Sequence, residues 1–200
     1  MNRLAPLAAA ALSAAALLAA GCGGSSSGGG PPSKPVDPNG PEVSPPGDIP
    51  DNQAFVAYAP AGAGFTVKVP EGWARTTAAG ATTFTDKLNS ITVARPTAAA
   101  KPPTAANATA TEIPRLAKTV TGFAGARAST VARTAGPAVR ITYLADSAPD
   151  AVTGKTRRNA VERYEFFRSG KRVVLTLSGP KGADNVDPWR IVTDSLRWTR

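Results

Sequence analysis

From residue 64 onward the chain alternates between apolar and polar residues, the pattern typical of strands that bury one face. Phe65, Val67 and Val69 fall on one face of a strand predicted over 64–69. Pro70-Glu71-Gly72 predicts a turn after it, because proline suits the second position of a turn and glycine accepts a positive φ. We expect Trp73 to begin the returning strand. The pattern predicts further short strands at 83–85, 91–93, 130–133 and 139–144.

A β-hairpin over 161–178 is the clearest element of the pattern. Ser169-Gly170 is a tight-turn signal between two runs of strand-forming residues. A hairpin centred there places three opposed pairs on one largely apolar face: Phe166 with Val173, Tyr164 with Leu175, and Glu162 with Leu177. The other face is mixed, with pairs such as Glu165 and Val174. One apolar face and one mixed face indicate a sheet that is covered on both sides.

Helices are predicted to provide that cover. A stretch rich in Pro, Thr and Ala over 96–111 predicts a loop that leads into the first helix. Apolar residues then recur at helical spacing at Ile113, Leu116, Ala117 and Val120. Asp187-Pro188 predicts the N-cap and first residue of a second helix over 189–196. The expected fold class is therefore α+β, an antiparallel sheet flanked by helices.

The N-terminal residues have the pattern of an exported protein. Arg3 precedes an uncharged stretch over 4–20 that is too short and too rich in alanine to favour spanning a membrane. Leu18-Ala19-Ala20-Gly21-Cys22 follows, and it resembles the lipobox of bacterial lipoproteins. Ala19 stands where the commonest lipobox has leucine, with Leu18 one residue earlier.

The lipobox resemblance implies a signal peptide over 1–21, with Gly21 before the cleavage point and Cys22 as the residue that receives palmitate-type chains. Acyl chains contribute about 0.8 kcal/mol per buried CH₂, so several chains would anchor the product to the extracytoplasmic face of the cell membrane. The alternative is an ordinary secretory signal with an incidental cysteine.

Composition divides the remaining chain into two parts. Residues 22–54 are rich in Gly, Ser and Pro and predict a disordered tether, and 55–200 is long enough for one domain with its own core. The tether carries one lysine against four acidic residues, whereas the domain carries twenty-one basic residues against ten acidic ones. A basic domain would be attracted to anionic lipid or wall polymer. The alternative is that the arginine content reflects the composition of the genome.

Residue types that are absent narrow the chemistry. The chain has no histidine, and Cys22 is its one cysteine. This excludes Ser-His-Asp and Cys-His nucleophiles, imidazole or cysteine metal sites, and an internal disulfide. We predict no catalytic residue, no metal and no cofactor. Glu162 is a weak candidate for a ligand site, because the hairpin places its carboxylate on the apolar face. The alternative is that Glu162 pairs with an arginine such as Arg140 at the rim of the sheet.

The order of elements over 55–200 resembles the PsbP-like fold. The residues that carry the resemblance are Phe65-Thr66-Val67-Lys68-Val69-Pro70-Glu71-Gly72-Trp73 with Phe84-Thr85-Asp86 as an opening hairpin, the strands over 162–177, and the closing Ser195-Leu196-Arg197-Trp198. This fold is an α/β/α sandwich known from the extrinsic PsbP protein of photosystem II, and it is similar to actinobacterial lipoproteins of the LpqN kind. The resemblance implies a non-enzymatic accessory or binding module.

The expected function is that of a membrane-anchored, extracytoplasmic binding module of the cell envelope. Its partners would be the membrane, through the lipid anchor, and an unidentified envelope protein, wall polymer or lipid. Nucleic acid is not expected, because the hairpin separates the two basic groups 155–158 and 168–172 by about 33 Å of strand. Two alternatives stay open: a carrier of a small apolar or lipid ligand held between sheet and helix, and a hydrolase that uses carboxylate or serine without histidine.

Overall fold

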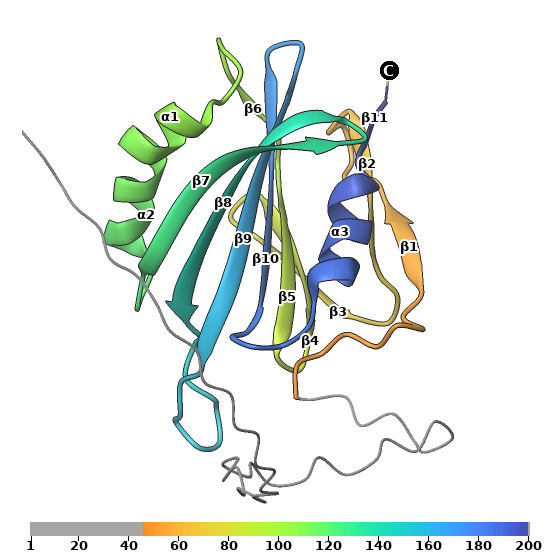
Figure 1. Cartoon of the computed structure of the whole chain (residues 1–200). Helices are drawn as coiled ribbons and strands as arrows, with labels where there is room; N and C mark the ends of the chain where they lie inside the picture. Colours follow the sequence, from red (N-terminus) through yellow and green to blue (C-terminus); the bar gives the residue numbers. More distant parts are fainter. Residues whose placement is uncertain (1–45, 200) are drawn as a thin grey trace, which may run out of the picture. The chain divides into compact units, whose positions relative to one another are not determined.

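The computed structural model describes residues 46–199, which form two antiparallel sheets and two helical segments (Figure 1). The predicted signal peptide, Gly21, Cys22 and most of the predicted tether lie outside the described residues. Within 46–199 no helix is long and apolar enough to cross a membrane. The α+β class, a sheet flanked by helices, is confirmed.

The larger sheet has the strand order β3-β4-β5-β10-β9-β8-β7, and the short β6 also pairs with β10. Its strands are β3 (Ala74–Ala78), β4 (Ala81–Asp86), β5 (Asn89–Ala94), β6 (Thr97–Ala98), β7 (Ala124–Arg133), β8 (Gly136–Asp146), β9 (Arg158–Arg168) and β10 (Lys171–Pro180). The predicted hairpin is β9–β10, and its register is confirmed at each of the three predicted pairs on the apolar face. Ser169 and Gly170 both have positive φ, as the favoured two-residue hairpin turn requires.

The smaller sheet has the order β1-β2-β11, with β1 (Phe55–Tyr58), β2 (Phe65–Pro70) and β11 (Arg197–Trp198). The predicted hairpin between 64–69 and a return at Trp73 is therefore wrong. After the turn at Gly72 the chain passes into the larger sheet, where β3 pairs with β4. Phe65 and Val67 of β2 are almost fully buried, whereas all of β3 is exposed, so burial assigns the two strands to different layers.

The first helical segment begins earlier than predicted. It consists of α1 (Ala105–Asn107), the π-helical turn η1 (Ala108–Glu112) and α2 (Ile113–Thr119), so the second half of the predicted loop 96–111 is helical. Thr104 caps it by accepting a hydrogen bond from the amide of Asn107. Thr109 and Thr111 donate to carbonyls four residues earlier, which satisfies hydroxyls that would otherwise compete with the helix.

The last helix, α3 (Val186–Asp194), also begins before its predicted start. Its N-cap is Asn185 rather than Asp187, and the Asn185 side chain makes no capping bond. That side chain is engaged elsewhere: its oxygen accepts from the amide of Ile49 at 2.8 Å, and its nitrogen donates to the carbonyl of Gly47 at 2.9 Å. Asp187 lies in the first turn of the helix, where a carboxylate still complements the helix dipole.

These contacts also correct the predicted end of the tether. Ile49 is 4% exposed and belongs to the main core, although it falls in the segment 22–54 that composition assigns to the tether. Asn89 donates to the carbonyl of Gly47 and lies within 3.1 Å of the Asn185 side chain. The domain therefore begins near residue 47 rather than at 55, because two buried asparagines bind the incoming backbone.

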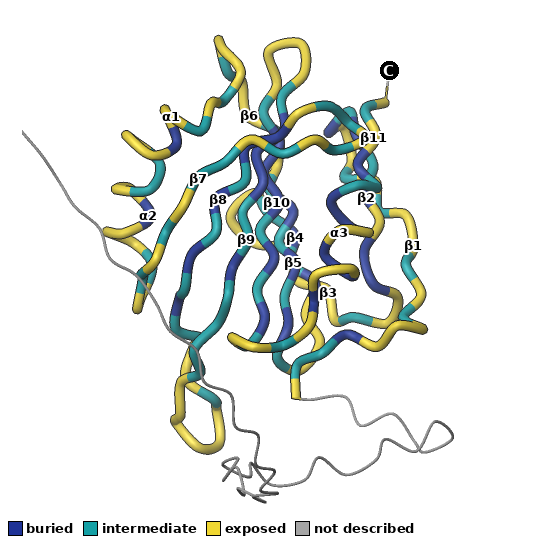
Figure 2. The backbone as a smooth tube through the Cα atoms, in the orientation of Figure 1, coloured by how far each residue is buried: buried dark blue, intermediate teal, exposed yellow. Residues whose placement is uncertain are grey.

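Both faces of the larger sheet are covered, and the core has two parts (Figures 1 and 2). On one face, α3 and the smaller sheet pack against β5, β10 and β9 through residues such as Val192, Leu196 and Phe166. On the other face, α2 packs against β8 and β9 through Leu116 and Ile141. The molecule thus has three layers: the first helical segment, the larger sheet, and a layer made of α3 and the smaller sheet. The third layer leaves part of the larger sheet uncovered at β7, β8 and β9, next to α3 (Figure 1).

Candidate functional site

Glu162 lies on β9, on the face of the sheet that α3 covers. The hairpin register places it opposite Leu177, and the alternation of the strand places Tyr164 next to it on the same face. The Glu162 side chain is 22% exposed, so it is neither in the core nor fully in solvent. Its Oε1 lies 3.5 Å from Nη1 of Arg140 on β8, the ion pair that the alternative to a ligand site at Glu162 predicts. Whether Glu162 also serves a ligand stays a prediction.

Tyr164 connects this carboxylate to the centre of the site. Its hydroxyl donates to Oε2 of Glu162 at 2.5 Å and accepts from Nη2 of Arg133 at 3.0 Å. Burial raises the pKa of the Tyr164 phenol, and the hydrogen bond to the Glu162 carboxylate raises it further. The hydroxyl is therefore a fixed donor that orients Glu162 over the whole physiological range.

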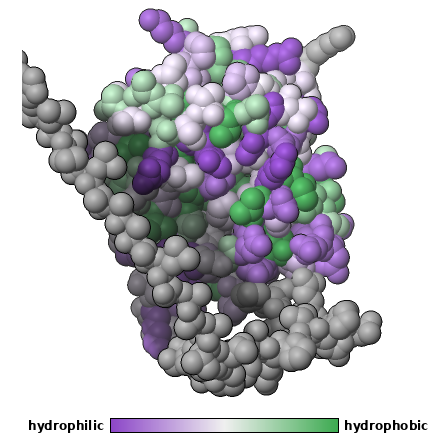
Figure 3. Space-filling view, in the orientation of Figure 1, coloured by the Kyte–Doolittle hydropathy of each residue, from purple (hydrophilic) through white to green (hydrophobic). Residues whose placement is uncertain are grey.

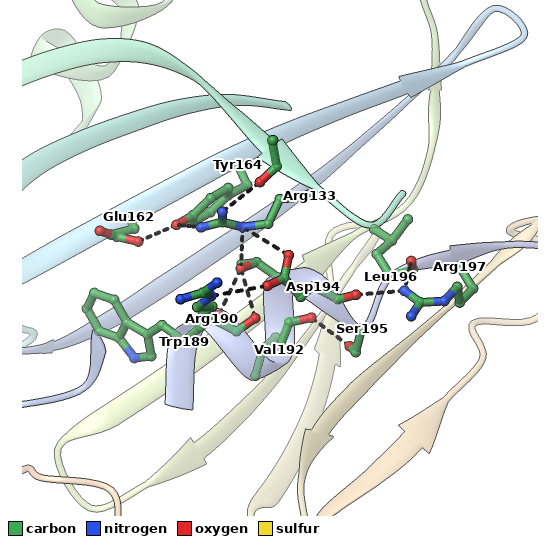
Figure 4. A network of polar contacts seen from close by, with 12 residues as sticks. Arg133, Glu162, Tyr164, Trp189, Arg190, Val192, Asp194, Ser195, Leu196 and Arg197 are labelled. Atoms are coloured by element: carbon green, nitrogen blue, oxygen red, sulfur yellow. Dashed lines mark hydrogen bonds and ion pairs between the residues drawn. The ribbon is translucent and has the colours of Figure 1, made fainter. Parts of the chain in front are cut away.

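Arg133, at the end of β7, joins the sheet to α3 (Figure 4). Its Nε donates to Oγ1 of Thr193 at 2.9 Å and lies 3.7 Å from the carboxylate of Asp194. Its guanidinium also stands over the Tyr164 ring, 5.1 Å from the ring centroid. Arg133 thus contacts Thr193 and Asp194 of α3 and both the hydroxyl and the ring of Tyr164 on β9. It therefore links the helix to the strands.

A cavity of about 370 Å³ lies beside this network. Its apolar walls come from Leu144 of β8, Ala160 of β9, and Val186 and Trp189 of α3. Its polar lining includes Glu162, Tyr164 and three arginines, Arg133, Arg140 and Arg190. Of these arginines, Arg140 forms the ion pair with Glu162, whereas Arg133 and Arg190 pair with Asp194. A few polar groups among apolar walls, in a volume of this size, is the usual constitution of a small-molecule site.

Glu162 is the acidic residue in the lining of this cavity. A histidine-free hydrolase would need a second carboxylate converging on Glu162 or an activated serine. The nearest acid of the network is Asp194, and Arg133 lies between it and the Tyr164–Glu162 pair. Within residues 46–199 no three acidic or cysteine side chains gather closely enough to hold a metal ion.

The sequence identified Glu162 and its arginine but not the rest of the site. Trp189, at the start of the predicted helix 189–196, is 7% exposed and packs in the core, yet it also lines the cavity. Arg133 and Arg190 carried no signal, because their positions depend on how α3 packs on the sheet. The two basic groups of the hairpin lie at its opposite ends, as expected, with Lys155 before β9 and Lys171 as the first residue of β10.

Comparison with known proteins finds no family model and no curated protein that matches the chain. Solved structures that are similar include the following two. LpqN of Mycobacterium tuberculosis, involved in cell envelope biogenesis, is 14% identical with a TM-score of 0.43, over 75% of this chain and 93% of that one. PA94 of Pseudomonas aeruginosa, a protein of unknown function, is 14% identical with a TM-score of 0.41, over 68% of this chain and 91% of that one. The fold class rests on the strands and helices of the chain itself.

Proposed function

We propose that this protein is a lipid-anchored, extracytoplasmic binding protein of the cell envelope, and that it holds a small, partly apolar ligand between α3 and the larger sheet. The observation that carries the proposal is the cavity of about 370 Å³, apolar on several walls and lined by the Glu162–Tyr164–Arg133 network. It lies where the carrier alternative places a ligand, between sheet and helix.

The polar network supports binding because it is already in place. Glu162 and Arg133 are held by Tyr164 without a ligand, so little side-chain entropy is lost when one binds. The amphiphilic lining selects a molecule with an apolar body and a hydrogen-bonding group. We propose, accordingly, that the protein binds this molecule without converting it.

The anchor and the family resemblance rest on the sequence. Leu18-Ala19-Ala20-Gly21-Cys22 supports cleavage after Gly21 and acylation of Cys22, which would place the domain on the outer face of the membrane. The elements over 55–200 support a PsbP-like module of the LpqN kind. Metabolic labelling with a palmitate analogue checks the anchor: the wild-type chain should take up label and Cys22→Ala should not.

Native mass spectrometry of the protein from its producer's own envelope tests the binding function. We expect a bound mass of a few hundred daltons on the wild-type chain. Ala160→Phe fills the cavity and should abolish the added mass, whereas Ala151→Phe, exposed in the β8–β9 loop, should leave it unchanged. A bare wild-type protein, or equal retention by both variants, would overturn the proposal and direct the search to protein or wall partners.

A further inference from the structure

The larger sheet has two ends of different character. We call the proximal end the loops 46–51, 86–89, 146–158 and 180–185, where the chain arrives from its N-terminal segment. Hydrogen bonds join these loops: Lys181 N donates to Arg158 O, and Asn89 Nδ2 donates to Gly47 O. We call the distal end the loops 59–64, 95–104, 133–136 and 168–172, which β6, the β9–β10 turn and the amide of Ala99 bring together. It lies at the top of Figure 1.

Of the two sets of loops, only the proximal set contains acidic residues. The proximal loops contain the carboxylates of Asp48, Asp51, Asp86, Asp146, Asp150 and Asp184. The distal loops contain no acidic residue, but they contain Arg95, Lys101, Arg133, Arg168, Lys171 and Arg172. A net excess of basic residues spread evenly over the surface would not produce this separation, so composition alone does not account for it.

Four of the distal cations have no carboxylate partner in the part of the chain that the structure describes. Arg133 pairs with Asp194 and Arg172 with Glu165, whereas Arg95, Lys101, Arg168 and Lys171 form no ion pair there. All four are exposed. Their fields therefore add outward from this end of the sheet, and hydrophilic side chains project along the upper edge in Figure 3.

Two hollows flank the β9–β10 turn between these cations. One, of about 560 Å³, is lined by Arg168, Lys171 and Trp198, and the other, of about 540 Å³, by Arg95 and again Lys171. Lys171 is thus shared by both hollows. The two hollows adjoin the same turn and carry cations on both sides of it, which suits an extended anionic chain better than a single ion.

Exposed apolar residues distinguish a polymer from a membrane surface. Among the described residues, Val152 is 93% exposed in the proximal β8–β9 loop and Val186 is 72% exposed at the start of α3. No large apolar residue is exposed in the distal loops. A surface that inserts into lipid needs apolar side chains to bury, so the distal end attracts by charge alone.

We propose that the distal end binds an anionic polymer that carries regularly spaced phosphate or carboxylate groups, such as an anionic wall polymer. The binding surface consists of Arg95, Arg168 and Lys171 around the β9–β10 turn, with Lys101 beside it. This surface is separate from the cavity under α3. The protein would thereby join two envelope components, a small ligand at its sheet face and a polyanion at its distal end.

Fluorescence anisotropy of a labelled polyphosphate chain tests this surface. The protein is the chain from residue 22 with Cys22→Ser, so the result does not depend on lipidation. We expect binding that weakens as salt rises from about 50 to about 200 mM. The distal variant Arg95→Gln/Arg168→Gln/Lys171→Gln should lose about ten-fold or more in affinity. The matched proximal variant Lys87→Gln/Lys155→Gln/Lys181→Gln removes the same charge and should change affinity less than about two-fold.

Three outcomes would overturn the proposal. Equal losses in the two variants would show that net charge, rather than the distal end, attracts the polymer. No binding of polyphosphate or of a poly-glutamate chain at low salt would show that the surface binds no polyanion. Tighter binding to anionic lipid vesicles, lost in the distal variant, would assign the surface to the membrane. Ala160→Phe should bind the polymer normally, which separates this test from that of the cavity.

Discussion

Glu162 and Glu165 lie three residues apart on β9 and face opposite sides of the same sheet, and they show how the two sides differ. The Glu165 side chain is 3% exposed beneath the first helical segment, between Arg163 at 3.4 Å and Arg172 at 3.6 Å. Glu162 is 22% exposed and borders a cavity beside α3. Glu165 is thus almost buried among its ion-pair partners, although it too borders a hollow, of about 330 Å³, under the first helical segment. Glu162 belongs to a more exposed network, so we expect the two carboxylates to differ in what they contribute to stability.

Removal of Glu165 should have the largest effect on stability. A buried pair that loses one partner usually costs about 3–5 kcal/mol. Arg163 keeps Glu112 at 2.9 Å, so we expect Glu165→Ala to lower the free energy of unfolding by about 2–3 kcal/mol. Urea denaturation measures this value. A loss no greater than that of an exposed residue would show that the cluster contributes nothing to the fold.

Truncation of Glu162 to alanine, on the α3 face, should affect binding more than folding. We expect Glu162→Ala to lower the free energy of unfolding by about 1 kcal/mol, since the remaining Arg140 is partly exposed and rehydrates. Glu162→Gln should leave stability nearly unchanged but reduce the amount of ligand found by native mass spectrometry. Unchanged stability together with unchanged ligand uptake in Glu162→Gln would remove Glu162 from the site.

Local chemistry accounts for the parts that the sequence predicted correctly. The β9–β10 register follows from one turn signal, Ser169-Gly170, because a two-residue hairpin turn and strand alternation leave no freedom in the pairing. The Glu162–Arg140 ion pair follows in turn, since Arg140 lies opposite Tyr164 on the neighbouring strand. Both predictions needed only contacts within one or two adjacent strands.

Contacts between distant segments account for the parts that were wrong or missed. The partner of β2 is decided by which layer buries Phe65 and Val67, and the pattern of β2 fits either sheet. Ile49 is held by Asn185, 136 residues away, so composition alone assigned its segment to a tether. The cavity likewise depends on the packing of α3 on β7–β9, for which Arg133 gave no local signal.

A smaller effect, that of Tyr164→Phe, should show whether the ligand depends on the polar network or only on the apolar walls of the cavity. Tyr164→Phe keeps the buried ring but removes the hydroxyl between Arg133 and Glu162. We expect a loss of about 1 kcal/mol in the free energy of unfolding, the net value of a hydrogen bond whose partners are partly hydrated. Ligand affinity should fall as well, because Glu162 loses its fixed orientation. Wild-type affinity in this variant would show that the ligand contacts the apolar walls alone.

We expect the smallest effects on stability from pH. One group on each face of the sheet is involved, Tyr164 at alkaline pH and Glu112 at acidic pH. On the α3 face, burial and the Glu162 carboxylate raise the pKa of Tyr164 above its ordinary 10.0. On the helical face, the hydrogen bond from Arg115 holds the pKa of Glu112 below its ordinary 4.5, with Arg163 adding to the effect. The first shift stabilises the folded protein below pH 10, and the second stabilises it above pH 4.5.

The sign of each effect follows from proton binding. Above pH 10 the folded state binds more protons than the unfolded state, so stability falls as pH rises; below pH 4.5 the unfolded state binds more, so stability falls as pH drops. Tyr164→Phe should reduce the loss of stability at alkaline pH and leave the loss at acidic pH unchanged. The alkaline loss should be reduced only in part, because burial also raises the pKa of Tyr143 on the other face. Glu112→Gln should remove most of the loss of stability at acidic pH, and it should also reduce the alkaline loss slightly, because the Glu112 carboxylate contributes to the raised pKa of Tyr143. Urea midpoints at pH 3–6 and 9–11 would contradict this assignment if Tyr164→Phe changed the acidic dependence.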